Sequence, residues 1–302
     1  MRIADLARPG RPVFSFEFFP PKTEEGAETL YASVERLQAL DPDFASVTYG
    51  AAGSTRDGTV EVCDRIQNEF GIETMAHLSC VGEQVSGLEA LIGRLERAGI
   101  ENILALRGDP PGGEGDFEAV EGGLAGSAEL AELIRARGTA GIGASCFPEI
   151  HPEATSADAD IEYAKRKVDA GAEFLITQLF FDNSVFFDWL DRARSAGIDV
   201  PIFVGVLPVR TFNGIKRMAS LCGAGIPDSL ATGLEACGGD GAAEREFGIA
   251  YAARQCEELL AAGVQGLHFY TLNKADSTSA VLGALKAARP WERAPEAAGA
   301  AS

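Results

Sequence analysis

Two kinds of hydrophobic pattern alternate along the chain. Short apolar runs rich in β-branched and aromatic residues are followed by longer stretches in which apolar residues recur every three or four positions. The first pattern is typical of buried strands and the second of amphipathic helices, so their alternation indicates a parallel sheet. The predicted strands are 13–19, 44–49, 73–80, 102–108, 141–146, 174–180, 201–206 and 266–271. Eight strand-and-helix units in roughly 250 residues predict an α/β fold, a single (β/α)8 TIM barrel.

Several of the connecting helices have recognisable ends. Apolar periodicity predicts helices at 29–40, 88–98 and 161–168. Gly99 and Gly171 come shortly after two of these helices and precede the next strand, as expected for glycines that end helices.

The longest gap between predicted strands separates the seventh from the eighth. It holds two further helical stretches, 226–234 and 244–262, around a glycine-rich patch, and we interpret it as an elaboration of the barrel. Residues 1–289 are therefore predicted to form one domain. The segment 290–302 is rich in Ala, Pro and Gly, a composition that predicts a disordered tail.

Composition and charge narrow the classes of partner. Apolar residues make up 46% of the chain and charged residues 24%, which is typical of a folded globular protein. A net charge of −19 repels polyanions, so neither nucleic acid nor a membrane surface is expected as a partner. Without a long apolar stretch or a secretory signal, the protein is expected in the cytoplasm. The six cysteines contain no C-x-x-C motif, so we predict reduced thiols and no metal site.

Side chains alternate between the two faces of each predicted strand. In the first strand Phe14, Phe16 and Phe18 share one face, which suits the layer between sheet and helices, and Glu17 then faces the barrel lumen. The polar residues that fall late in the strands are Glu17, Thr48, His77, Arg107, Asp109 and Gln178.

The same alternation makes two further assignments. Leu104 and Leu106 are placed on the helix-facing side, opposite the polar pair that follows them in the fourth strand. His268 and Tyr270 share one face of the last strand. No carboxylate or cysteine partner lies near them in sequence, so they are interpreted as packing residues.

The late polar residues should meet at one end of the barrel. Active sites of such barrels assemble where the strands end, from several strands at once. Burying these groups without partners would cost about 1–3 kcal/mol each, which favours a polar ligand. Three structural alternatives remain open: an ion pair between Arg107 and Asp109, a hydrogen-bonded core position for His77, and a position on the rim for Gln178.

Glu17 is the strongest candidate for acid–base chemistry. A carboxylate flanked by aromatic residues in a poorly hydrated mouth has its charged form disfavoured, which suits a general acid near neutral pH. The alternative is a salt bridge to Lys22 or Arg107.

A basic cluster, residues 165–167, stands near the end of the helix that Ser156 is predicted to cap and Gly171 to end. It either complements the helix dipole or binds a cofactor phosphate. The chain lacks the glycine fingerprints of Rossmann and P-loop sites, so any nucleotide must be held differently.

Nine sequence blocks resemble the bacterial methylenetetrahydrofolate reductases, which are flavin enzymes built on a (β/α)8 barrel. The likeness runs from about residue 13 to residue 288. The blocks are SFEFFPPK, SVTYGA, HLSC, LALRGDPP, FPEIHPEA, KRKVDAGA, TQLFFD, GVLPV and HFYTLN.

This resemblance implies an FAD-dependent enzyme of one-carbon and methionine metabolism. The flavin would be reduced by NADH or NADPH and would then pass hydride to 5,10-methylenetetrahydrofolate, giving 5-methyltetrahydrofolate. The two substrates would take turns at the flavin in a ping-pong reaction. A cytoplasmic homo-oligomer is expected.

The resemblance also implies roles for residues of this sequence. Glu17 matches the general acid that assists opening of the methylene bridge, Asp109 the carboxylate that binds the pterin and tunes the flavin, and Gln178 a folate contact. The positions that match flavin-binding residues are Thr48, His77, Arg107, Gly108, Asp109, Phe147, His151, Asp160, Arg166 and Lys167.

Four positions depart from the family pattern. Phe147 stands where a tyrosine is common, so stacking on the flavin can persist without the hydroxyl. Lys274, a predicted substrate-binding residue, replaces a planar guanidinium with a point charge. Gly214 and Met218 stand where relatives carry Gln and Phe, which leaves the choice between NADH and NADPH open.

Two other functions remain compatible with the sequence. One is a Schiff-base lyase that uses Lys274 or Lys22 as its nucleophile. The other is a folate-binding protein that receives electrons from a partner and does not turn over a nicotinamide itself.

Overall fold

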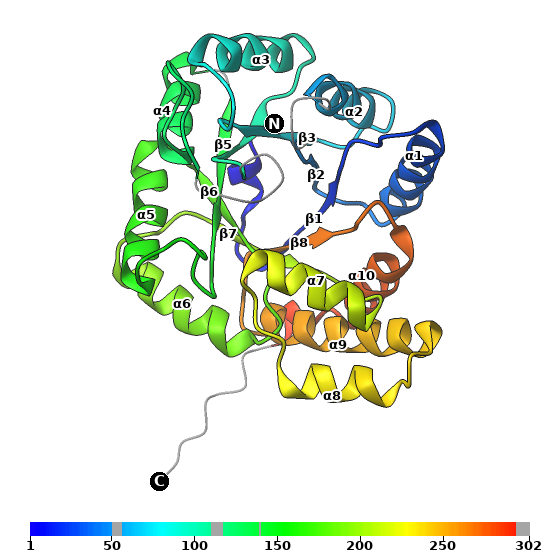
Figure 1. Cartoon of the computed structure of the whole chain (residues 1–302). Coiled ribbons are helices and arrows are strands. Elements are labelled where there is room, and N and C mark those ends of the chain that lie inside the picture. Colours follow the sequence, from blue (N-terminus) through cyan, green and yellow to red (C-terminus); the bar gives the residue numbers. More distant parts are fainter. Residues whose placement is uncertain (50–55, 110–116, 139, 294–302) are drawn as a thin grey trace.

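Eight parallel strands form a closed barrel in sequence order, which confirms the predicted TIM barrel (Figure 1). The computed structural model describes residues 1–49, 56–109, 117–138 and 140–293. The strands are β1 (Val13–Phe18), β2 (Phe44–Val47), β3 (Thr74–Ser79), β4 (Asn102–Leu106), β5 (Gly141–Cys146), β6 (Phe174–Thr177), β7 (Ile202–Val206) and β8 (Gly266–Tyr270). The predicted sixth strand extended to residue 180, whereas β6 ends at Thr177, so Gln178 lies in the loop that follows.

Helices surround the strands as an outer layer (Figure 1). They are α1 (Glu24–Gln38), α2 (Arg56–Asn68), α3 (Val85–Arg97), α4 (Ser127–Arg137), α5 (Ala157–Ala170), α6 (Asn183–Ser195), α7 (Phe212–Cys222), α8 (Asp228–Ala236), α9 (Gly241–Ala261) and α10 (Ala275–Ala288). Within the described ranges no helix is both long and apolar enough to traverse a bilayer. All six cysteines are free.

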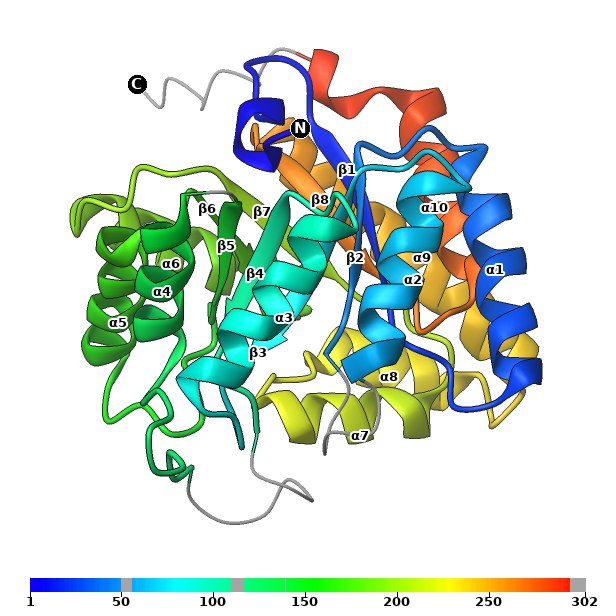
Figure 2. The same cartoon turned by 90° about the horizontal axis from the view of Figure 1, so that it is seen from above.

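The two faces of the barrel wall bury different apolar clusters. Phe14, Phe16 and Phe18 pack with the surrounding helices, as the alternation predicts. The lumen holds a second cluster that includes Phe44 and Phe174. The 3-10 helix η1 (Ile3–Leu6) packs against this second cluster and lies at the end of the barrel where the strands begin (Figure 2). Apolar side chains thus fill the lumen at the end where the strands begin, so polar groups can gather only at the end where the strands terminate.

The prediction that Leu104 and Leu106 face the helices is wrong. Leu104 belongs to the apolar cluster in the lumen, and Leu106 packs against it. The strand ends at Leu106, and Gly108 then turns the chain with a φ of +84°. Because strand alternation stops before Arg107, the faces of the leucines cannot be inferred from the polar residues that follow.

The long connection between β7 and β8 contains α7, α8 and α9. Its apolar side chains form a third cluster with the ends of the neighbouring strands, including Leu207 and Tyr270. The connection between β7 and β8 therefore packs directly against the barrel. Figure 2 shows α7 lying across the end at which the strands terminate.

The start of the predicted disordered tail is ordered. Pro290–Glu292 form the 3-10 helix η3, and the Trp291 ring lies 5.6 Å from the Phe14 ring, centroid to centroid. The prediction of disorder rested on the content of proline, glycine and alanine, and it did not consider that one aromatic residue could anchor this segment. The remainder of the predicted tail, 294–302, lies outside the described residues.

Candidate active site

Glu17 lies in the lumen between two histidines. Its Oε2 atom is 3.5 Å from Nε2 of His77 and 3.6 Å from Nε2 of His268, and its side chain is 17% exposed. The alternative of a salt bridge to Arg107 is wrong, because that guanidinium pairs with Glu153. The carboxyl group is thus held among imidazoles at the polar end of the barrel.

The interpretation of His268 as a packing residue is only partly right, because its ring stacks on Phe44 with centroids 5.7 Å apart but also has polar partners. Its ring is fully buried, with Nδ1 2.8 Å from the hydroxyl of Ser15 and Nε2 3.2 Å from the hydroxyl of Ser46. Ser15 pairs with His268 in register across the β1–β8 seam. The first and last strands become neighbours only when the barrel closes, so no partner was visible near this histidine in sequence.

Tyr270, the second residue interpreted as packing, lies beside Glu17 across the same seam. Its hydroxyl donates a hydrogen bond to the Thr177 carbonyl at 2.6 Å. Burial raises the pKa of this phenol well above its ordinary value, with the charge of Glu17 as a further cause. The tyrosine therefore stays protonated and links β8 to the last residue of β6.

His77 is buried and faces Glu17. Burial lowers its pKa to about 4, although the charge of Glu17 acts in the opposite direction. In the part of the chain that the structure describes, its Nε2 atom has no hydrogen-bond partner. This observation does not support a satisfied core histidine, and the imidazole is neutral at pH 7.

A cavity of about 680 Å³ lies among the loops that follow β4, β5 and β6 and the inner face of α5. Most of the predicted site residues line it. They are Arg107, Gly108, Asp109, Phe147, His151, Asp160, Lys167 and Gln178. Five others are not among its lining residues: Glu17, Thr48, His77, Arg166 and Lys274.

The basic cluster divides between the cavity and the surface. Lys167 is 3% exposed, and its ammonium donates to the Ser145 carbonyl and lies 5.1 Å from the centre of the Tyr163 ring. Arg166 points elsewhere, is 61% exposed and pairs with Glu129 at 2.5 Å. Residues share a helix face when they are three or four positions apart, so the consecutive residues Arg166 and Lys167 point in different directions.

Asp160 lies on the cavity face of α5, one turn before Tyr163 and two turns before Lys167. Burial raises the pKa of Asp160, and the nearby charge of Lys167 acts against that shift. Burial lowers the pKa of Lys167, and Asp160 in turn acts against that. The two groups partly compensate each other's burial. Sequence analysis missed Tyr163, which its spacing from these two residues could have revealed.

Arg107 is fixed by a carboxylate from the next loop. Its guanidinium makes two bonds to the Glu153 carboxylate, one of them from Nη2 at 2.7 Å, and it lies over the Phe117 ring at 5.1 Å. The predicted alternative, an ion pair with Asp109, is not the arrangement observed. Sequence analysis also missed Glu153, although it stands two residues after His151 in the same block.

His151 completes one wall of the cavity with Phe147. The two rings meet edge to face with centroids 4.6 Å apart, and His151 Nδ1 accepts a hydrogen bond from the Glu153 amide at 3.1 Å. Burial and the charge of Arg107 lower the pKa of His151. This wall therefore presents an aromatic face and a neutral imidazole.

Gly108 permits the tight turn between β4 and the cavity. A Cβ atom there would overlap the Ser79 hydroxyl and lie 2.7 Å from Cγ1 of Val81. With a φ of +84°, the position is suited to glycine on two independent grounds. Asp109 follows on the exposed rim of the cavity.

The remaining predicted residues lie around the mouth. Thr48 directly follows β2, and its amide donates to the Phe18 carbonyl at 2.9 Å. Lys274 is the exposed N-cap residue of α10. Gly214 and Met218, the positions of family departure, both lie on α7.

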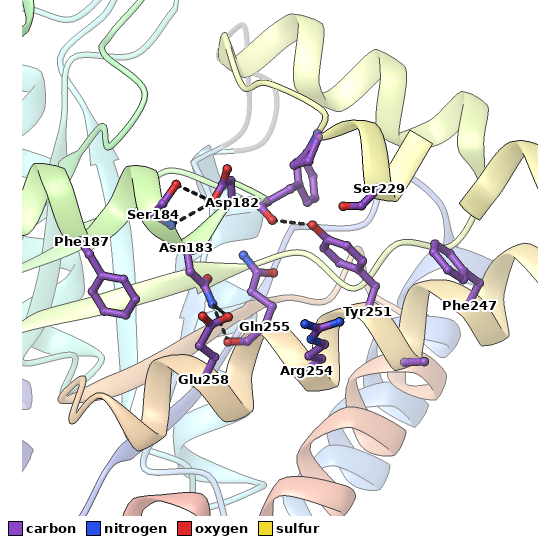
Figure 3. Close-up of a pocket in the computed structure, with 13 residues that line it drawn as sticks. Asp182, Asn183, Ser184, Phe187, Ser229, Phe247, Tyr251, Arg254, Gln255 and Glu258 are labelled. Carbon is purple, nitrogen blue, oxygen red and sulfur yellow. Dashed lines mark hydrogen bonds between the residues drawn. The ribbon is translucent and has the colours of Figure 1, made fainter. Parts of the chain in front are cut away.

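A second cavity, of about 710 Å³, lies away from all these residues, beside α6, α8 and α9 (Figure 3). Several of its polar groups bond to one another. The Tyr251 hydroxyl donates to the Phe181 carbonyl at 2.8 Å, and the Asn183 amide donates to Glu258 at 2.9 Å. None of the predicted site residues lines it. We therefore place the candidate active site in the lumen and the cavity of about 680 Å³.

Comparisons with known proteins identify the family of this chain. The family model described as methylenetetrahydrofolate reductase matches residues 2–286. The chain is 40% identical over 267 residues to 5,10-methylenetetrahydrofolate reductase of Salmonella typhimurium, covering 88% of each chain. It is also 40% identical over 292 residues to methylenetetrahydrofolate reductase (NADH) 1 of Zea mays, covering 93% of this chain and 49% of that relative. The chain thus spans about half the length of the plant relatives.

A solved structure supports the fold alone. A Clostridium thermocellum protein, described as binding two copies of 5-methyl-5,6,7,8-tetrahydrofolic acid, superposes with a TM-score of 0.64 at 16% identity. The match covers 96% of this chain and 99% of that protein. The family match over nearly the whole chain, and the bacterial relative of similar length, are the stronger findings. This chain belongs to the methylenetetrahydrofolate reductase family.

Proposed function

We propose that this protein reduces 5,10-methylenetetrahydrofolate to 5-methyltetrahydrofolate, using NADH or NADPH as the source of hydride and FAD as its carrier. The observation that carries the proposal is the position of Glu17. Its carboxyl group lies in the lumen, within 3.6 Å of two imidazoles, at the end of the barrel where a polar cavity opens. Barrel enzymes place their chemistry at this end.

The residues around the cavity of about 680 Å³ fit a flavin dinucleotide. Lys167 and Arg107 supply positive charge for phosphates, and Phe147 supplies an aromatic face. The turn at Gly108 has no side chain, so a ligand can approach its backbone closely. When bound, FAD would take hydride from the nicotinamide and deliver it to the folate.

Glu17 would act as the proton donor. A protonated carboxyl group that delivers its proton to an amine nitrogen of the methylene bridge opens the bridge to an iminium, which can accept hydride. Positioned acids of this kind accelerate reactions by about 10²- to 10⁴-fold. The imidazole of His268, which hydrogen-bonds Ser15 and Ser46, would hold the carboxyl group in place from one side.

Three further side chains would contact the folate. Asp109 and Gln178 line the cavity and can hydrogen-bond the donors and acceptors of a pterin. Lys274 stands at the exposed start of α10 and would attract the carboxylates of the substrate's glutamate tail. Thr48 and His77 would complete the cofactor site from β2 and β3.

Anaerobic spectroscopy tests the whole proposal in two steps. The purified protein should be yellow, bleach on addition of NADH or NADPH, and regain colour when 5,10-methylenetetrahydrofolate is added. A colourless protein that takes up no FAD would contradict the proposal. A yellow protein that neither nicotinamide bleaches would instead favour electron supply from a partner.

A further inference from the structure

The loop between β5 and α5 is tied to the connection that follows α7. The Gly225 amide donates a hydrogen bond of 2.7 Å to Oε2 of Glu149. Next to this bond, a Cβ atom at Gly223 would lie 3.0 Å from Cγ of Pro152, so the two chain segments are already in close contact. Two separate contacts therefore join these segments, which are far apart in sequence.

The two glycines of this junction differ in what they permit. Gly223 ends α7 in the left-handed region with a φ of +71°, and its amide donates to the Ala219 carbonyl. A Cβ atom at Gly225 would lie 2.9 Å from the Glu149 carboxylate oxygen. Gly223 is thus favoured by its positive φ, whereas the missing side chain at Gly225 leaves room for the Glu149 carboxylate.

The loop that carries Glu149 has an unfavourable backbone conformation. Ile150 has a φ of +69°, a value that β-branched residues rarely adopt and that persists only where the surroundings enforce it. Its own amide bonds back to the Phe147 carbonyl at 3.2 Å. Glu149, the residue before Ile150, accepts the hydrogen bond from the Gly225 amide. This bond connects the strained loop to another part of the fold.

Both of the segments that this contact joins lie near the candidate site. The loop carries Phe147, His151 and Glu153, all of which line the cofactor cavity. At the other end, the last residue of α7 is Cys222, whose pKa is raised to about 11 by burial and by the charges of Asp109 and Glu17. The end of α7 is therefore within electrostatic reach of the mouth that α7 crosses (Figure 2).

We propose that Glu149 is a positioning residue that fixes α7 relative to the wall of the cofactor cavity and so sets the opening through which the folate enters. The inference rests on the proposed function, since it assigns the mouth to the folate. Glu149 itself is not among the residues that line the cavity. It acts through Gly225 on α7 and through its own loop on the aromatic wall.

The contact needs the carboxyl oxygen and not the charge. Burial and the nearby charge of Asp182 raise the pKa of Glu149, whereas the bond from Gly225 lowers it. A glutamine can accept the same hydrogen bond without a charge that burial disfavours. Glu149→Gln is therefore the conservative variant, and Glu149→Ala is the variant that removes the contact.

The test compares steady-state kinetics with hydrogen exchange. In Glu149→Ala we expect the KM for 5,10-methylenetetrahydrofolate to rise about tenfold, which corresponds to about 1.4 kcal/mol, with a smaller change in kcat. Amide exchange should become faster in residues 147–154 and 212–225 together. Glu149→Gln should restore both the KM and the exchange rates to within about twofold of the unmodified protein.

Asp43→Ala is the matched control. Asp43 also accepts a backbone hydrogen bond, from the Phe14 amide at 2.8 Å, but it lies next to the start of β1, at the opposite end of the barrel. It should lower stability without changing the folate KM. If Glu149→Ala folds, binds flavin and keeps an unchanged KM and unchanged exchange in both segments, the inference is wrong. If the unmodified protein fails the two-step bleaching test, the proposed function is wrong, whereas the exchange result still reports on the contact.

Discussion

Nε2 of His77 lies 3.5 Å from the Glu17 carboxylate, and burial lowers the pKa of this imidazole to about 4. At neutral pH the histidine is therefore not a cationic partner for the glutamate. Its ring occupies the lumen without neutralising the carboxyl group, and on the opposite side His268 is engaged by two serine hydroxyls. Glu17 thus has no cationic partner at His77, which suits the role of proton donor that we propose for it.

Glu17→Gln should separate the two half-reactions. The amide keeps the size and polarity of the side chain but cannot donate an acidic proton, so folate reduction should fall by at least about 10²-fold. Reduction of the flavin by NADH or NADPH needs no proton from this residue and should stay within about threefold. Anaerobic stopped-flow measurement of each half-reaction checks this. Equal losses in both would remove the acid assignment.

His77 should make stability depend on pH. An unfolded histidine has an ordinary pKa of 6.5, whereas burial lowers the folded pKa to about 4, so the unfolded state binds the proton more readily between these values. The stability is complete above pH 6.5 and is lost as the pH falls toward 4. The full loss, reached below pH 4, is about 3 kcal/mol, and about 2 kcal/mol of it falls between pH 7 and pH 5. Urea unfolding of the flavin-free protein at pH 7 and pH 5 measures it.

His77→Asn provides the comparison for that measurement. Asparagine does not titrate, so the variant should lose less stability than the unmodified protein between pH 7 and pH 5, whatever its stability at pH 7. His151→Asn is a matched control, because His151 is only half-buried and its titration should contribute less. Parallel pH profiles for His77→Asn and the unmodified protein would contradict the pKa of about 4.

The barrel itself could be predicted from the sequence because each strand carries its own local signal. Apolar runs and the alternation of Phe14, Phe16 and Phe18 against Glu17 depend on nearest neighbours, and the structure confirms both. The contact of His268 with Glu17 depends instead on closure of β1 against β8, which joins residues about 250 positions apart. Sequence spacing contains no local signal for such a contact.

Backbone turns account for the other differences. Alternation failed at Leu104 because the strand ends at Leu106 and Gly108 changes the chain direction. The basic cluster could be assigned only in part, because three consecutive helix positions face three directions. Lys167 enters the cavity and Arg166 reaches Glu129. The spacing of Asp160, Tyr163 and Lys167, by contrast, was sufficient to predict that these three residues share one face of α5.

Gly108→Ala should damage both stability and cofactor binding. The new Cβ would overlap the Ser79 hydroxyl, and its φ of +84° alone costs about 1–2 kcal/mol for a residue with a side chain. We expect a total loss of about 3 kcal/mol and a weaker FAD affinity. Gly82→Ala is the matched control, since Gly82 also has a positive φ of +68° but no atom within 4 Å of the new methyl group. The Gly82→Ala variant should lose only the stability that the positive φ costs, and its affinity for FAD should not change. Equal losses in the two variants, by thermal unfolding and flavin titration, would show that packing against Ser79 is unimportant.

Trp291→Ala should destabilise the barrel without affecting the reaction. The indole packs against Phe14 at the start of β1, at the end of the barrel opposite the candidate site, and both rings leave water in that contact. Because Trp291 is only partly buried, we expect a loss of about 2 kcal/mol, less than the 3–5 kcal/mol typical of a fully buried aromatic residue. Trp291→Phe keeps an aromatic partner for Phe14 and should lose less than about 1 kcal/mol. Denaturant unfolding measures both variants, and the two flavin half-reactions serve as the control for activity. A Trp291→Ala protein as stable as the unmodified one would mean that η3 rests on the surface without contributing to the core.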